Sequence, residues 1–210
     1  MASYALALMV IYLALAFGVR VAVALRQTGS TGIASPGSAP GIELVGGGMF
    51  AVAVLLGGIN PLLAVLGVVE LANGLDQTWA HVAGFVLCGI GIVGTFAAQM
   101  AMGASWRIGV DPEERTELVT GGVFGLCRNP IYTFMIVAWA GFALLVPTWV
   151  AAVAGVLLIV GLEIQVRLVE EPHLIRTHGE PYRAWASRVG RFVPGFGRLS
   201  AEPQQAQNRR

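Results

Sequence analysis

The sequence contains few charged residues and no lysine. Only 12% of its 210 residues are charged, against about 25% in a typical soluble domain. So few charges cannot cover a water-exposed globule, because apolar residues make up 56% of the chain and occur in long blocks. The two cysteines, Cys88 and Cys127, have neither disulfide-framework nor metal-ligand spacing. The net charge of +1 gives no reason to expect a nucleic-acid partner. We therefore predict an all-α, polytopic membrane protein.

Four apolar blocks predict the membrane spans. They cover residues 4–25, 42–71, 81–102 and 131–161. No basic residue precedes the first block, the reverse of a cleaved signal peptide, so we expect it to be retained as a span. The second and fourth blocks exceed the roughly 20 residues of one straight span. Asn60-Pro61 in the second block is compatible with one kinked helix or with two short helices. Pro147-Thr148 in the fourth predicts a helical hairpin over residues 130–167.

The distribution of arginine selects one topology. Short loops rich in arginine stay in the cytoplasm. If the second block crosses once and the fourth crosses twice, all thirteen arginines share one side, and the loop at 72–80 and the Pro147 turn hold none. We therefore expect about five transmembrane helices and a short cytoplasmic helical cap. The N-terminus would lie outside the cell (inner) membrane and the C-terminus in the cytoplasm.

Three polar segments fall on the arginine-rich side of this topology. They cover residues 102–110, 118–132 and 163–182. The hairpin would bring the stretch 128–132 beside the stretch 163–171. Ionisable residues at membrane depth are costly and indicate functional sites, and Glu163, inside an apolar run, is the clearest case.

Taken singly, these residues also have simpler interpretations. Arg128 and Arg167 are placed to anchor helix ends at the interface by snorkelling. Trp106 beside a span is typical of an interfacial aromatic belt. His173 and His178 lack the spacing of a metal site, and none is predicted.

Taken together, the second and third polar segments resemble the isoprenylcysteine carboxyl methyltransferase family of membrane methyltransferases. The resemblance is carried, in order, by Leu118-Val119-Thr120, Gly122, Phe124, Arg128-Asn129-Pro130-Ile131-Tyr132, Glu170-Glu171, Leu174, Gly179, Tyr182, Val189 and Pro194. The segment Ser105-Trp106-Arg107-Ile108-Gly109 looks like that of bacterial members. Eukaryotic members have histidine where this chain has Gly121 and Asn129, which puts in doubt prenylated protein C-termini as substrates.

The resemblance implies S-adenosylmethionine as cofactor and a lipophilic small molecule or lipid, entering from the bilayer, as methyl acceptor. The cofactor-binding residues that it implies are Leu118, Val119, Gly122, Arg128, Asn129, Pro130, Tyr132, Glu170, Glu171, Leu174 and Tyr182. The candidate catalytic residues are Arg107, Arg128, Arg167 and Glu163. An arginine can orient an acceptor carboxylate. Glu163 is included because it is an ionisable residue inside an apolar run. Residues 1–103 would then hold the first three spans with a Gly/Pro/Ser-rich loop at 27–41, residues 104–197 the methyltransferase core, and residues 198–210 a disordered tail.

Three other functions stay open at this point. A phospholipid N-methyltransferase would need a carboxylate or tyrosine near the sulfonium to deprotonate its amine. The second is a nicotinamide-dependent lipid reductase. The third is a non-catalytic membrane scaffold or transporter subunit. The sequence predicts neither the acceptor nor the oligomeric state.

Overall fold

The described part of the chain is helical throughout. The computed structural model describes residues 1–33, 41–72, 74, 77–109 and 117–200, and these contain no β-strand beyond isolated bridges. The helices are α1 (Ala2–Leu13), α2 (Arg20–Thr28), α3 (Gly41–Val65), α4 (Thr78–Ala101), α5 (Pro130–Leu145), α6 (Trp149–Ile164), α7 (Glu171–His178) and α8 (Glu180–Ala186). π-helical segments, Ala14–Val19 and Gln165–Glu170, join α1 to α2 and α6 to α7. The predicted all-α class is confirmed.

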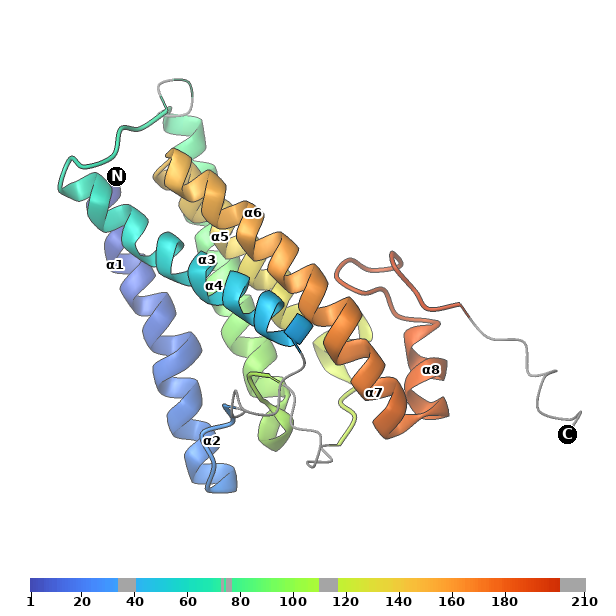
Figure 1. Cartoon of the computed structure of the whole chain (residues 1–210). Helices are drawn as coiled ribbons and strands as arrows, with labels where there is room; N and C mark the ends of the chain where they lie inside the picture. Colours follow the sequence, from blue (N-terminus) through green and yellow to red (C-terminus); the bar gives the residue numbers. More distant parts are fainter. Residues whose placement is uncertain (34–40, 73, 75–76, 110–116, 201–210) are drawn as a thin grey trace, which may run out of the picture.

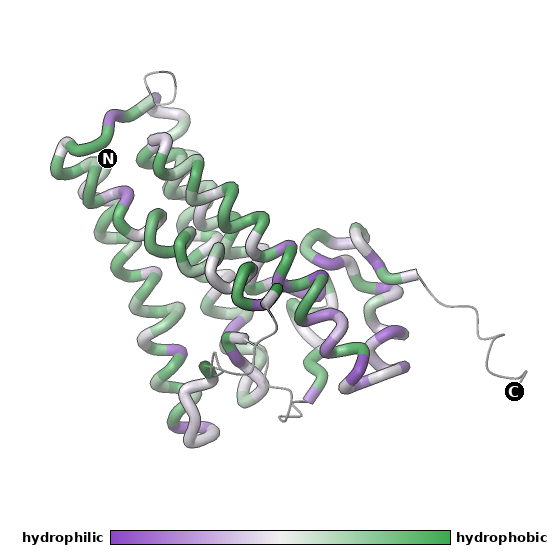
Figure 2. Tube along the Cα trace, in the orientation of Figure 1, coloured by the Kyte–Doolittle hydropathy of each residue, from purple (hydrophilic) through white to green (hydrophobic). Residues whose placement is uncertain are grey.

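The long helices form one bundle, and α7 and α8 extend from one end of it (Figure 1). Helix α4 packs chiefly on α5, and α3 packs chiefly on α6. Small residues permit the first contact, since a Cβ atom on Gly91 would lie 2.3 Å from the backbone nitrogen of Ala138. Apolar residues cover the bundle, whereas polar residues gather near α7 and α8 (Figure 2).

Five helical runs match the five predicted spans. Within the described residues, the runs Ala2–Thr28, Gly41–Val65, Thr78–Ala101 and Trp149–His178 are long and apolar enough to cross a membrane, and Pro130–Leu145 is a shorter apolar helix. The second apolar block forms a single helix, α3, with Pro61 near its end. The alternative of two short helices is therefore wrong.

The predicted hairpin is present, and its turn is fixed to α3. Thr148 caps α6 by accepting a hydrogen bond from the backbone of Ala151 at 3.1 Å. Its hydroxyl donates to Asn60, whose side-chain amide donates to the carbonyl of Val146 at 3.2 Å. Asn60 is buried, so accepting from Thr148 and donating to Val146 removes the cost of an unsatisfied amide in the apolar bundle.

The arginine-bearing loops meet at the opposite end of the bundle. Arg20 donates to the carbonyl of Gly103, and the backbone of Ile108 donates to Gly32 at 2.8 Å. At the turn end, Ala72 donates to the carbonyl of Pro147 at 2.7 Å. The loops that carry arginine therefore lie at one end of the bundle and the loops without arginine at the other, as the arginine distribution predicts. Residues 34–40 of the expected loop and 201–210 of the expected tail lie outside the described residues.

Candidate active site

The C-terminal segment holds the start of α5. Pro130 occupies the first helical turn, where its missing N–H costs nothing. The backbone N–H of Arg128 donates to Gly190 at 2.8 Å, and that of Asn129 donates to Arg191 at 3.0 Å. The Asn129 side chain donates to the same Arg191 carbonyl at 3.1 Å. Residues that begin the hairpin are thereby fixed beside residues that follow α8.

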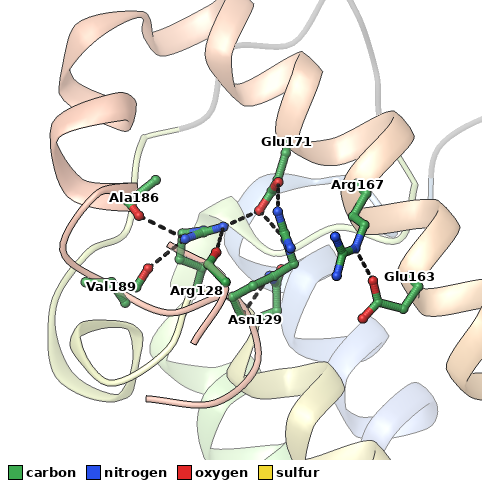
Figure 3. Close-up of polar contacts among 9 residues, drawn as sticks. Arg128, Asn129, Glu163, Arg167, Glu171, Ala186 and Val189 are labelled. Atoms are coloured by element: carbon green, nitrogen blue, oxygen red, sulfur yellow. Dashed lines mark hydrogen bonds and ion pairs between the residues drawn. The ribbon is translucent and has the colours of Figure 1, made fainter. Parts of the chain in front are cut away.

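Arg128 is bound almost entirely by the protein itself. Its side chain is only 1% exposed. The guanidinium donates to the carbonyls of Ala186 at 3.0 Å, Val189 at 2.6 Å and Gly197 at 3.1 Å, and to the carboxylate of Glu171 (Figure 3). Four of its five N–H donors are thus used. Arg128 therefore acts first as a clamp on the C-terminal segment.

Glu171 is shared by two arginines. Besides Arg128, it accepts two hydrogen bonds from Arg191, one on each carboxylate oxygen and both 2.8 Å long. The hydrogen bond to Glu171 raises the pKa of the Arg191 guanidinium. Two cations around one buried carboxylate keep it ionised and leave the trio with a net positive charge.

A π-helical turn precedes two adjacent glutamates, Glu170 and Glu171, whose carboxylates contact different partners. The segment Gln165–Glu170 leads directly into α7. Pro172 has no N–H, and in a regular α-helix its ring would clash with the carbonyl four residues earlier, so the wider turn accommodates it. Glu171 then faces the arginine pair, while Glu170 accepts a hydrogen bond from the Tyr132 hydroxyl at 2.6 Å.

A second carboxylate and an amide lie near Glu170. Glu43, close to the start of α3, and Gln165 both interact with the Glu170 carboxylate and line the same cavity. Gln165 is buried, and its Oε1 atom has no hydrogen-bond partner. Sequence reasoning missed Glu43, because it begins an apolar block and belongs to no motif. Only the packing of α3 on α6 brings it to the site.

A cavity of about 880 Å³ collects most of the candidate residues. It is bordered by α3, α5, the end of α6 with α7, and the loop after α4. The candidates that line it are Arg107, Leu118, Val119, Arg128, Asn129, Pro130, Tyr132, Glu170, Glu171, Leu174 and Tyr182. A smaller cavity of about 60 Å³ shares Phe17, Val54 and Met135 with it. The shared residues extend the site into the apolar bundle.

Three candidates do not line this cavity. Glu163 and Arg167 form an ion pair one helical turn apart, and their side chains are 38% and 53% exposed (Figure 3). Gly122 begins an exposed turn at φ +58°, a backbone conformation that favours glycine. Among the described residues, no group of three or more His, Cys, Asp and Glu side chains is placed to hold a metal ion.

Aromatic residues form an apolar wall of the cavity. Tyr182 and Trp185 meet edge to face, with ring centroids 5.6 Å apart, and pack in a cluster with Phe124. Leu118, Val119 and Leu174 pack against this cluster. Burial raises the pKa of the Tyr182 hydroxyl, so the ring stays neutral. Sequence analysis proposed Tyr182 but missed Trp185 and gave Phe124 no role.

The wall opposite α7 is built around a buried arginine. Arg20 is 1% exposed and lies over the Trp106 ring, with its guanidinium carbon 4.6 Å from the ring centroid. Trp106 is 4% exposed and lines the cavity. The interfacial-belt interpretation of Trp106 is therefore wrong: the loop after α4 folds inward over the cavity, and Arg20 holds it there.

Comparison with known proteins identifies the class. Residues 79–181 match the family model described as phospholipid methyltransferase. Among solved structures, the fold is similar to that of a eukaryotic intramembrane Ras methyltransferase, ICMT (isoprenylcysteine carboxyl methyltransferase), with a TM-score of 0.53 and 17% sequence identity over 88% of this chain and 75% of that chain. A search of curated protein sequences gives no significant match.

These findings define an integral membrane methyltransferase. Within that class, the fold is like that of ICMT, and the region that matches the phospholipid methyltransferase model begins in α4 and ends in α8. The resemblance given by the sequence motifs is thereby confirmed. Both comparisons support a methyltransferase over the lipid reductase and the non-catalytic membrane protein.

Proposed function

We propose that this enzyme transfers a methyl group from S-adenosylmethionine to a lipophilic acceptor in the 880 Å³ cavity. The observation that carries the proposal is the composition of the cavity wall. An aromatic slot lies on one side, carboxylates lie at the end of α6, and the apolar bundle lies beyond. These three surfaces match an adenine ring, a cationic donor and a lipid acceptor.

The adenine would lie in the apolar slot formed by Leu118, Val119, Leu174 and Tyr182, with Trp185 as a further wall. Flat aromatic and aliphatic surfaces are typical of such pockets. When bound, the cofactor supplies a methyl group already activated by its sulfonium. The protein therefore needs mainly to align donor and acceptor and to exclude water.

The charged residues divide into two roles in this proposal. Arg128 and Glu171 position the C-terminal segment, because their hydrogen bonds are already used within the protein. Glu170, supported by Tyr132, faces the cationic end of the cofactor. Arg107, which lines the cavity across from α7, would orient an acceptor carboxylate.

A specific observation also favours an amine acceptor. Glu43 and Glu170 line the cavity together, and Tyr132 donates to Glu170. An ammonium group binds to carboxylates and must lose a proton before it attacks a methyl group, and Glu170 is placed to accept that proton. Phospholipid N-methylation is therefore the second candidate function.

The orientation that we propose follows from the arginine distribution. The site end of the bundle would face the cytoplasm, because the arginines that the structure describes lie toward that end, and short arginine-rich loops stay in the cytoplasm. The N-terminus of α1 would then lie outside the cell (inner) membrane.

Calorimetric titration of the detergent-purified protein with S-adenosylhomocysteine tests the cofactor proposal. Glu171→Ala and Arg128→Ala should each weaken binding at least tenfold, because the C-terminal wall of the cavity is released. Arg198→Ala, which alters an exposed side chain, is the matched control and should bind as the parent does. Equal effects at all three positions would show that the site lies elsewhere.

A further inference from the structure

The loop that follows α8 ends in an exposed apolar tip. Residues 192–196 read Phe-Val-Pro-Gly-Phe and carry no charge. Val193 is 52% exposed and Phe196 is 75% exposed. Leu126 and Leu168, from two other segments at the same end of the bundle, are 63% and 55% exposed.

The tip closes on itself through backbone hydrogen bonds. The backbone N–H of Arg191 donates to the carbonyl of Phe196 at 2.7 Å, and that of Phe196 donates to Val193 at 3.1 Å. A Cβ atom on Gly190 would lie 2.1 Å from the carbonyl oxygen of Val193, so the loop closes tightly on itself. Exposure of the two apolar side chains is therefore built into the loop.

Helix geometry places this tip at the depth of the membrane boundary. The Thr133 hydroxyl, in the first turn of α5, donates to the carbonyl of Phe192 at 2.7 Å. Helix α5 has 16 residues, and its length of about 24 Å falls short of the roughly 30 Å hydrocarbon core. The lipid phase must therefore reach past an end of α5, toward the segments packed there.

The neighbouring helix gives the same depth. From Trp149 to Leu168 the chain rises slightly less than about 30 Å, so Leu168 would lie near the edge of a hydrocarbon core that begins at Trp149. Glu170 is two residues further and bonds to Tyr132 at the start of α5. The start of α5 and the tip bonded to it would thus lie at the lipid–water boundary.

We infer that the 192–196 tip inserts into the lipid interface and anchors the C-terminal segment to the membrane. Its backbone suits that place, because Pro194 has no N–H and the carbonyls of Val193 and Phe196 are already bonded. Arg188 and Arg198 flank the tip and are exposed, so they would meet anionic headgroups.

Insertion would have a consequence for the cavity. Arg128 donates to the carbonyls of Val189 and Gly197 on either side of the tip, and it also contacts Glu171. The membrane anchor is therefore joined by direct hydrogen bonds to residues that line the cavity. This inference depends on the membrane location of the chain and is independent of the cofactor proposal.

Spin labelling of the full chain in lipid nanodiscs tests the anchor. A nitroxide at Phe196→Cys should collide more with oxygen, which concentrates in lipid, than with a water-soluble nickel chelate. The label at Ser200→Cys, four residues along and also exposed, should show the reverse. Both native cysteines are buried, which limits background labelling. Adding phosphatidylglycerol to phosphatidylcholine discs should increase the ratio of oxygen to nickel collisions at position 196.

Two results would overturn the inference. One is equal access of the nickel chelate to positions 196 and 200 in both lipid mixtures. The other is protection of position 196 from both reagents together with dipolar coupling between labelled copies, because a second chain would then cover the tip. Substitution at position 196 should not disturb folding, since the side chain is 75% exposed.

Discussion

Replacing Glu171 with glutamine should destabilise the protein more than any other single isosteric change at the site. The substitution keeps the volume of the side chain but removes the charge that two arginines share. Arg128, only 1% exposed, would lose its carboxylate partner, and Arg191 would lose a two-point contact. Removing one partner of a buried pair costs about 3–5 kcal/mol. Arg128 keeps three carbonyl acceptors, so we expect about 3 kcal/mol.

A double-mutant cycle in mixed detergent micelles measures this effect. Unfolding free energies would be compared for Glu171→Gln, Arg128→Met and the double variant. We expect the double variant to be less destabilised than the sum of the two single variants by at least about 1 kcal/mol, because the two side chains are in direct contact. A cost below about 1 kcal/mol for Glu171→Gln, or full additivity in the cycle, would refute the clamp that we describe.

Three further predictions concern other parts of the structure. Gly91→Val should prevent folding, because its Cβ atom would lie 2.3 Å from the α5 backbone. The control Gly89→Ala should express normally, because no atom lies within 4 Å of the added Cβ. Equal expression yields of the two variants would contradict the α4–α5 contact. Tyr132→Phe removes the hydrogen bond to Glu170 and should slow methyl transfer more than tenfold while S-adenosylhomocysteine affinity changes less, and an unchanged rate would exclude this pair from the reaction. Glu163→Gln should destabilise the protein by more than about 1 kcal/mol, because Arg167 would lose its partner beside the lipid boundary, and a loss of about 0.5 kcal/mol or less in unfolding measurements would place the pair in water.

Local sequence rules predicted the fold better than they predicted the site. Five spans and a hairpin could be predicted from the length of the apolar blocks, the break at Pro147 and the arginine distribution. These signals are general, because lipid imposes the same requirements on every helix. The motifs also placed Arg128 and Tyr132 beside Glu170 and Glu171. Their contacts required only that the hairpin fold back on itself.

The remaining site residues depend on contacts between distant segments. Glu43 belongs to no motif and was not proposed, and Arg20 served only to fix the topology. Their positions follow from α3 packing on α6 and from the loop after α4 folding over Arg20, and no motif encodes either contact. Glu163 was proposed from its place inside an apolar run, but the helix turns it outward to pair with Arg167.

A methyl-transfer assay tests the central claim most directly. The purified enzyme in nanodiscs would be incubated with S-adenosylmethionine labelled in its methyl group and with total membrane lipid, and the label in the lipid fraction would be counted. We predict enzyme-dependent labelling that is inhibited by S-adenosylhomocysteine. Release of the label by mild alkali as volatile methanol would indicate a methyl ester, and label that stays non-volatile after alkali would indicate N-methylation. Absence of labelled lipid, from protein that binds S-adenosylhomocysteine, would contradict a lipophilic acceptor.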